Sequence, residues 1–329
     1  MSIENYRIQD YRDALSHIRM VSRYGLSKMP PLIISCAITG GVQGKQANPN
    51  LPETPEEQAQ QAYDAYCAGA SVIHIHARDP KDTSKMTTRV EDYQKVNALI
   101  RRRCPDVIIN NTCGGVRYIT KPDGEHYQVS PMQHLSVPAD PEIATIDITC
   151  MANRLRGNIT FMAYQDLEAV VDELHEKGIK AEFECWKPDD FKYLAYLQGK
   201  GKLDDPYLVQ MLFGGNGTFP IPEELLLTAR TMPENGMLSV IGIGACQTAM
   251  VTQAILMGHH VRVGMEDNVY YGYRQLAEDN AQFVKRVVRL AKDLGRPVAT
   301  PAQAREMMGL SALPKSYEFA HGEGSVENA

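Results

Sequence analysis

The feature that most constrains the fold is an alternation of short apolar runs with amphipathic segments. Runs rich in β-branched and aromatic residues and bounded by turn residues indicate strands at 32–37, 71–76, 107–111, 143–149, 181–186, 208–213, 237–243 and 260–265. Segments with helical spacing fall at 55–68, 90–103, 165–177, 189–197, 222–230, 245–257 and 274–294. The strands are too apolar to leave one face in water, which favours a closed parallel sheet. The expected fold class is α/β, a (β/α)8 TIM barrel with an added N-terminal helical segment.

An open doubly wound sheet is the competing architecture. It would more often carry a glycine-rich phosphate turn after its first strand, but the sequence there, ITGGVQGK, matches neither common nucleotide-binding pattern. Residues 1–30 are expected to form the helical extension, residues 31–314 the barrel, and residues 315–329 a polar tail. Thr54, Pro55 and Glu57 predict a capped helix start, and Gly69 and Gly178 predict helix ends.

Composition narrows the possible partners and the cell compartment. A net charge of −6 and a pI near 5.9 provide no basic footprint for nucleic acid. No apolar run reaches the length of a membrane span or a signal peptide core, so a cytoplasmic protein without a membrane partner is expected. The seven cysteines form no CxxC pair, and we expect buried, reduced thiols.

Polar residues cluster where the predicted strands end, which is the edge of a barrel that carries its chemistry. His74 and His76 are two residues apart on a strand, so both side chains point to the same face. Two imidazoles inside a barrel indicate half of a metal site, although a hydrogen-bonded pair of core histidines is the alternative. A carboxylate on a neighbouring strand end would complete a site for Zn²⁺, and Fe(II) uses the same ligand types.

The segment HVRVGMEDN (260–268) supplies that carboxylate. Glu266 ends the eighth strand, which neighbours the first and second strands in a closed barrel. Asp267 beside it is then free to move protons. Arg262 shares the face of Glu266 and is expected to pair with Asp267 or with an anionic intermediate, or to form only a structural ion pair.

Two glycine-rich stretches and three further histidines have less specific interpretations. The stretches 213–217 and 242–244 fit ordinary turns, or the close approach of a long phosphate-bearing ligand. His259 precedes the eighth strand and is expected to be structural. His126 and His134 lie in a long loop and are expected to be exposed, with a role in a lid as the alternative.

Four motifs together resemble one family. PLIISCAITGG, the run ending in HIHARDP, NNTCGG and HVRVGMEDN, in this order and spacing, resemble the β-keto acid cleavage enzymes over residues 31 to 312. The resemblance implies a zinc-dependent (β/α)8 barrel, usually a homotetramer. It implies an enzyme that converts a β-keto acid and acetyl-CoA into acetoacetate and the acyl-CoA of the remaining fragment.

The resemblance also implies roles for individual residues. The family's zinc ligands correspond to His74, His76 and Glu266. Its catalytic aspartate and arginine correspond to Asp267 and Arg262, and its strand-five glutamate to Glu184 or, by a shift of two, to Glu182. Residues that would hold the substrate are Asn111 and Thr112, the backbone amides of Gly114 and Gly115, and Thr149.

One departure from the family's pattern concerns specificity. The founding enzyme has a glutamate after AITG that receives an ammonium group, and Val42 stands at that position here. We therefore expect a substrate with a neutral or apolar side chain.

Two other classes of function stay open. A metal-dependent hydrolase or a class II type aldolase is the enzymatic rival, although amidohydrolase barrels need histidines on strands five and six, where Glu184 and Phe213 stand. A noncatalytic sensor of zinc or CoA esters is the other, and it would not need the Asp267 base.

Overall fold

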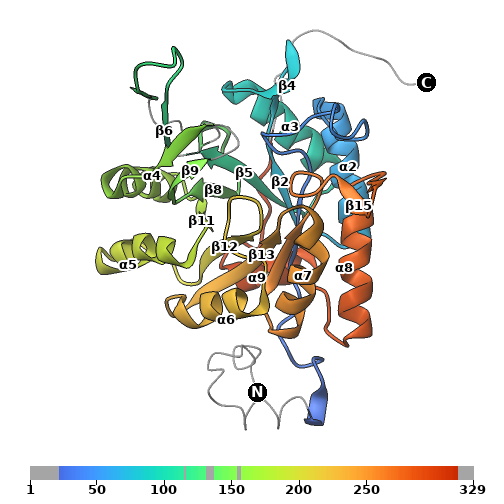
Figure 1. Cartoon of the computed structure of the whole chain (residues 1–329). Helices are drawn as coiled ribbons and strands as arrows, with labels where there is room; N and C mark the ends of the chain where they lie inside the picture. The colour runs from blue at the N-terminus through green and yellow to red at the C-terminus, as the bar shows by residue number, and fades with distance from the viewer. Residues whose placement is uncertain (1–21, 115, 131–136, 154–156, 318–329) are drawn as a thin grey trace, which may run out of the picture.

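The computed structural model describes residues 22–114, 116–130, 137–153 and 157–317. Within them eight parallel strands close into a barrel (Figure 1), which confirms the expected fold. All eight predicted strands are present, with ends shifted by a few residues. They are β1 (Ile34–Ala37), β2 (Val72–Ile75), β5 (Ile108–Gly114), β8 (Ile143–Asp147), β11 (Lys180–Cys185), β12 (Tyr207–Phe213), β13 (Gly236–Gly242) and β14 (His260–Val263).

Among the described residues an α-helix follows every barrel strand except β5, and these helices surround the barrel (Figure 1). The first of them starts at the predicted capping box, because Thr54 accepts a hydrogen bond from the Glu57 amide and Glu57 bonds back to the Thr54 amide. It ends at Gly69, whose positive φ of 115° suits glycine. The α-helices are α2 (Pro55–Ala68), α3 (Val90–Arg103), α4 (Tyr164–Glu176), α5 (Phe191–Gly199), α6 (Pro222–Thr231), α7 (Gln247–Leu256), α8 (Ala281–Asp293) and α9 (Pro301–Met308).

The barrel residues divide between two apolar clusters because side chains alternate along each strand. Ile73, Ile109 and other outward residues pack against the helices in the larger cluster. Val72, Ile108 and other residues of opposite parity form a smaller cluster with α9. The helix α9, which was not predicted from the sequence, thus covers the N-terminal end of the barrel. The upper part of the interior is left to polar side chains.

Short strands outside the barrel follow several of its strands. They form the hairpin β3 (Arg78–Asp79) with β4 (Asp82–Met86), the sheet of β6 (Arg117–Thr120), β7 (Gln128–Val129), β9 (Cys150–Asn153) and β10 (Asn158–Phe161), and the hairpin β15 (Tyr270–Gly272) with β16 (Gln275–Leu276). Those labelled in Figure 1, β4, β6, β9 and β15, lie in the upper half of the view. The expectation of a helix from residue 274 was wrong, because the hairpin occupies this segment and α8 begins at Ala281. In the described residues the connections also contain three 3-10 turns, η2 (Val137–Ala139), η3 (Pro188–Asp190) and η4 (Gly244–Cys246).

Several further expectations meet the structure only in part. The helical extension over residues 1–30 and the tail over residues 315–329 lie mostly outside the described residues, as does His134. All seven cysteines are free, but Cys67 and Cys150 are exposed, so the expectation of burial was wrong for these two. They lie on a helix surface and in a strand outside the barrel.

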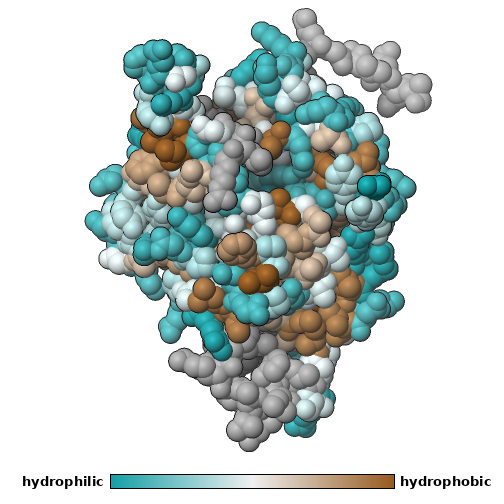
Figure 2. All heavy atoms as spheres, in the orientation of Figure 1, coloured by the Kyte–Doolittle hydropathy of each residue, from teal (hydrophilic) through white to brown (hydrophobic). Residues whose placement is uncertain are grey.

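The surface mixes polar and apolar residues. In Figure 2 hydrophilic residues cover much of the visible face, and apolar residues gather in separate patches among them. Among the described helices, none combines the length and the apolar character needed to cross a bilayer.

Candidate active site

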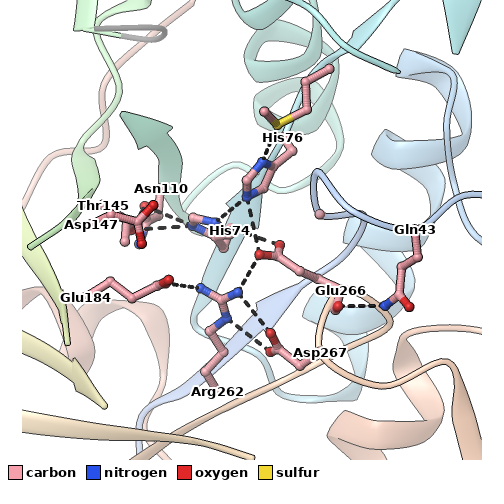
Figure 3. Close-up of polar contacts among 12 residues, drawn as sticks. Gln43, His74, His76, Asn110, Thr145, Asp147, Glu184, Arg262, Glu266 and Asp267 are labelled. Atoms are coloured by element: carbon pink, nitrogen blue, oxygen red, sulfur yellow. Dashed lines mark hydrogen bonds and ion pairs between the residues drawn. The ribbon is translucent and has the colours of Figure 1, made fainter. Parts of the chain in front are cut away.

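Residues from neighbouring strands meet at the C-terminal end of the barrel (Figure 3). β1 pairs with β14 on one side and with β2 on the other, as expected for the eighth, first and second strands of a closed barrel. His74 lies in β2 and His76 one residue beyond it, while Glu266 and Asp267 follow β14. The structure therefore brings together the four residues that the two motifs predicted.

Glycines permit the sharp turn that carries the two acids. Gly264 has a φ of +144°, and a Cβ there would lie 2.1 Å from the carbonyl oxygen of Ala37. A Cβ on Gly40 would lie 2.6 Å from Cγ of Glu266. Larger residues at either position would push the end of β14 away from β1. The Glu266 amide then donates to the Ala37 carbonyl, which fixes the carboxylate beside the histidines.

The geometry of the two histidines and Glu266 fits a metal ion. His74 Nε2 lies 3.2 Å from His76 Nε2 and 3.8 Å from Glu266 Oε2, and His76 Nε2 lies 3.2 Å from Glu266 Oε1. Tetrahedral zinc with bonds of about 2.0–2.1 Å separates its ligand atoms by about 3.3 Å. Glu266 Oε2 is buried and has no hydrogen-bond partner among the described residues, and a cation would satisfy this oxygen. These residues can hold Zn²⁺ and leave one position open for substrate.

Arg262 forms ion pairs with the acidic side chains around it (Figure 3). Its side chain is 2% exposed, and its guanidinium binds Asp267 through two hydrogen bonds of 3.1 and 3.0 Å. It also donates to Glu266 at 2.5 Å and to Glu184 at 3.1 Å, and to Gln210 Oε1 at 3.0 Å. One cation thus faces three carboxylates, so the pairing of Arg262 with Asp267 that the sequence indicated is present.

Burial and charge separate the acidities of these groups. Burial raises the pKa of Asp267 to about 6, against the opposing effect of Arg262. Burial acts in the same direction on Glu266, but Arg262 and the histidines hold the pKa of that carboxyl well below its usual range. For His74, burial and the charge of Arg262 lower the pKa to about 3, so the ring is neutral and suited to a metal.

Glu184 belongs to a second group of acids at the same edge. It pairs in register with Asp147 on the neighbouring strand, and Trp186 Nε1 donates to Asp147 Oδ1 at 3.0 Å. Burial and the neighbouring Asp147 raise the pKa of Glu184 well above its usual value. Asp147 and Trp186 were not predicted as site residues. Only the strand register places Asp147 beside Glu184, and Trp186 joins the group through its hydrogen bond to Asp147.

The Nδ1 atoms of the two histidines contact different partners. His74 Nδ1 lies 3.2 Å from Asn110 Oδ1, and His76 Nδ1 lies 3.0 Å from the Met86 sulfur. Gln43 donates at 2.6 Å to the main-chain oxygens of both Met265 and Glu266. The sequence predictions missed Asn110, Met86 and Gln43. His74 pairs with Asn110 in the strand register, which sequence spacing does not reveal.

The other predicted substrate residues lie at varied distances from this cluster. Asn111 has the parity of Ile109 and Cys113, which pack toward the helices. Within the part of the chain that the structure describes, its side-chain amide has no hydrogen-bond partner. Thr149 donates to Asp190 Oδ1 at 3.2 Å. These two roles stay predictions.

The remaining predicted positions are in or near the loops of the barrel mouth. Thr112 is buried and pairs in register with Thr145, and Gly114 ends β5 with a φ of +72°. Val42 is 76% exposed and precedes Gln43 in the loop against Glu266. Gly115 lies outside the described residues.

Comparison with known proteins places this site in a family. The family model "beta-keto acid cleavage enzyme" matches residues 31–310. A 3-keto-5-aminohexanoate cleavage enzyme of Fusobacterium nucleatum is 37% identical over 283 residues, 86% of this chain and 99% of that protein. A 3-oxoadipate:acetyl-CoA acetyltransferase of Cupriavidus necator is 30% identical over 293 residues, 86% of this chain and 96% of that protein.

A solved structure supports the fold independently. The apo structure of ObcA superposes with a TM-score of 0.66 at 19% identity, covering 80% of this chain and 66% of that one. At this identity the likeness concerns the barrel alone. The family match and the two relatives, each aligned over most of the chain, carry the assignment, and the chain belongs to the beta-keto acid cleavage enzyme family.

Proposed function

We propose that the protein is a zinc-dependent enzyme that converts a β-keto acid and acetyl-CoA into acetoacetate and the corresponding acyl-CoA. One observation carries this proposal: the buried carboxylate of Asp267, whose pKa burial raises to about 6, lies next to three side chains that could hold a metal ion. His74, His76 and Glu266 would hold the zinc. The names of the relatives from F. nucleatum and C. necator support the class of reaction.

Asp267 is suited to act as the base that starts the reaction. Its two hydrogen bonds with Arg262 orient the carboxylate, and the raised pKa makes it a stronger base than an exposed aspartate. A bound zinc ion would act as a Lewis acid toward the β-keto carbonyl. Asp267 would then remove a proton from the carbon between the carbonyl and carboxylate groups of the substrate.

The resulting carbanion would attack the thioester carbonyl of acetyl-CoA and release the CoA thiolate. Attack of this thiolate on the original keto carbon breaks the bond between that carbon and the former nucleophile. The products are the acyl-CoA and the carbanion of acetoacetate, which takes the proton back from Asp267. Arg262 and Glu184 lie beside Asp267 and would position the charges that develop.

The substrate is proposed to carry a neutral or apolar side chain. Val42 stands in the loop beside Glu266, and a valine there offers no countercharge to an ammonium group. We further propose that the protein is a cytoplasmic homotetramer. Light scattering of the purified protein would test the tetramer, and cell fractionation would test the compartment.

The decisive experiment is a panel of β-keto acids with charged, polar and apolar side chains, incubated with acetyl-CoA and zinc-loaded protein. Acetoacetate and the matching acyl-CoA should appear together for the preferred substrate. Asp267→Asn should remove turnover while zinc stays bound. A zinc-loaded protein that yields no acetoacetate across the panel would contradict the proposal. A sensor would be favoured instead if the wild type bound acyl-CoA without any turnover and Asp267→Asn bound it equally well.

A further inference from the structure

A buried network of polar side chains lies behind His74, on the side away from the proposed metal. Asn110 Nδ2 donates to Glu182 Oε2 at 2.6 Å, and Thr145 Oγ1 lies 2.7 Å from the same oxygen. Thr145 Oγ1 also lies 2.8 Å from Asn110 Oδ1 and 3.5 Å from His74 Nδ1. These side chains come from four adjacent strands, β2, β5, β8 and β11. All four are at most 4% exposed.

The strand register holds this network in place. His74 is opposite Asn110 on β5, and Glu182 is opposite Thr145 on β8. Glu182 shares the inward face of Glu184 but lies one pleat deeper, so the two acids serve different neighbours. Glu184 contacts Arg262, whereas Glu182 contacts Asn110 and Thr145.

The direction of each hydrogen bond follows from counting donors. Burial raises the pKa of Glu182, and the hydrogen bonds from Asn110 and Thr145 act against burial in favour of the carboxylate. A carboxylate only accepts, so ionised Glu182 requires the NH2 group of Asn110 to face it. The amide oxygen of Asn110 then faces His74, and it can accept only if His74 Nδ1 carries the hydrogen. In a neutral imidazole this leaves the lone pair on Nε2, the atom that faces His76 and Glu266.

We propose that Glu182 is a positioning residue that fixes the tautomer of His74 through the amide of Asn110. The inference rests on the proposed function, since a defined Nε2 lone pair matters for holding zinc. If the Asn110 amide turned over, its NH2 group would face Nδ1, and the ring hydrogen would move to Nε2 and block the metal. Glu182 excludes that arrangement without touching the ring.

Glu182→Gln is the discriminating variant, because glutamine has the same size but can present either an oxygen or an NH2 group to Asn110. Both orientations of the Asn110 amide are then satisfied, and His74 should become a mixture of tautomers. We expect an approximately 10-fold weaker zinc affinity, the lower end of the range for partners that orient a metal-bound histidine. Glu142→Gln is the matched control, since Glu142 is also buried in the barrel wall but binds Arg101 and Arg305.

A double variant tests this inference by exchanging the amide of residue 110 with the carboxylate of residue 182. In Asn110→Asp combined with Glu182→Gln, the carboxylate lies next to His74 and the amide lies where Glu182 was. The carboxylate introduced by Asn110→Asp would accept from His74 Nδ1 and from the glutamine NH2 group. The Nδ1–H tautomer and a zinc affinity within about 3-fold of the wild type should return.

Nitrogen-15 NMR of histidine-labelled, metal-free protein near pH 7.5 reads the tautomer directly, with His74→Gln to assign the signal. The expected results are Nδ1–H in the wild type, in Glu142→Gln and in the double variant, and a mixture in Glu182→Gln. An Nε2–H ring in the wild type, or an unchanged ring in Glu182→Gln, would overturn the inference. The wild-type measurement can refute it even if a variant does not fold. The metal-free readout does not depend on zinc, so a wild type that binds no zinc would refute the proposed metal site separately.

Discussion

Replacing Arg262 with lysine would test the central role of its guanidinium. The change keeps the positive charge but removes the planar fork that binds Asp267 through two parallel hydrogen bonds. Arg262 makes five hydrogen bonds in total, to three carboxylates and one amide oxygen. A lysine ammonium has three donors, so at least two of these bonds disappear.

The expected cost follows from this count. A hydrogen bond to a charged group contributes about 1.5–3 kcal/mol. Two lost bonds therefore lower the free energy of unfolding by about 3–6 kcal/mol, and water entering the barrel mouth would bring the loss toward the lower figure. The ammonium lacks the planar fork that orients both oxygens of Asp267, so kcat/KM should fall further than zinc content does.

Urea denaturation at a fixed zinc concentration measures the stability, and acetoacetate release measures kcat/KM. Arg296→Lys is the matched control, because Arg296 is 1% exposed and donates four hydrogen bonds to backbone carbonyls at the opposite end of the barrel. It should destabilise the fold by a comparable amount and leave kcat/KM of the folded protein unchanged. The reasoning fails if Arg262→Lys retains full turnover, or if both lysine variants lose turnover equally.

Three other predictions concern neighbouring residues. Val42→Glu should raise kcat/KM for a β-keto acid with an ammonium group and lower it for an apolar one, each by about 5-fold for an exposed charge, as a substrate panel would show. Met86→Leu removes the sulfur behind His76 and should weaken zinc binding less than 10-fold in a chelator competition, a smaller effect than that of Glu182→Gln. Asp267 acts in its ionised form, so kcat/KM should fall as the pH drops through about 6 and below. The charge of a bound zinc ion would shift this fall in kcat/KM to lower pH. A pH profile that is flat down to pH 4 would exclude Asp267 as the base.

The barrel could be predicted because the residues that mark each of its strands and helices lie close together in the sequence. Each of the eight strands is a short apolar run, and the helix starting at Pro55 carries its own capping signal. The sheet formed by β6, β7, β9 and β10 was not predicted, since its strands have at most four residues and are partly exposed. Their pairing depends on segments distant in sequence. α9 was missed although Thr300 caps it in the same way as Thr54 caps α2.

For the site, the residues within one motif were predictable and the contacts between strands were not. HIH and RVGMED each place their side chains by spacing alone, so His74, His76, Arg262 and Glu266 could be proposed together. Asn110 differs from the predicted Asn111 by one position, and that position decides which face of β5 it occupies. Only the register of β2 against β5 shows that Asn110 is the partner of His74.

The charges at the barrel mouth explain why these residues form one unit. Among the described side chains Arg262 faces Glu184, Glu266 and Asp267, so the acids outnumber the cation that binds them. Burial raises the pKa of Glu184 and Asp267, while that of Glu266 is lowered. Paired acids whose environments drive their pKa values apart can take separate roles. Glu266 stays an anion and suits a metal, whereas Asp267 can exchange a proton near neutral pH. A divalent cation at the two histidines would offset the excess of negative charge, and the same cation would keep Asp267 ionised when the substrate arrives.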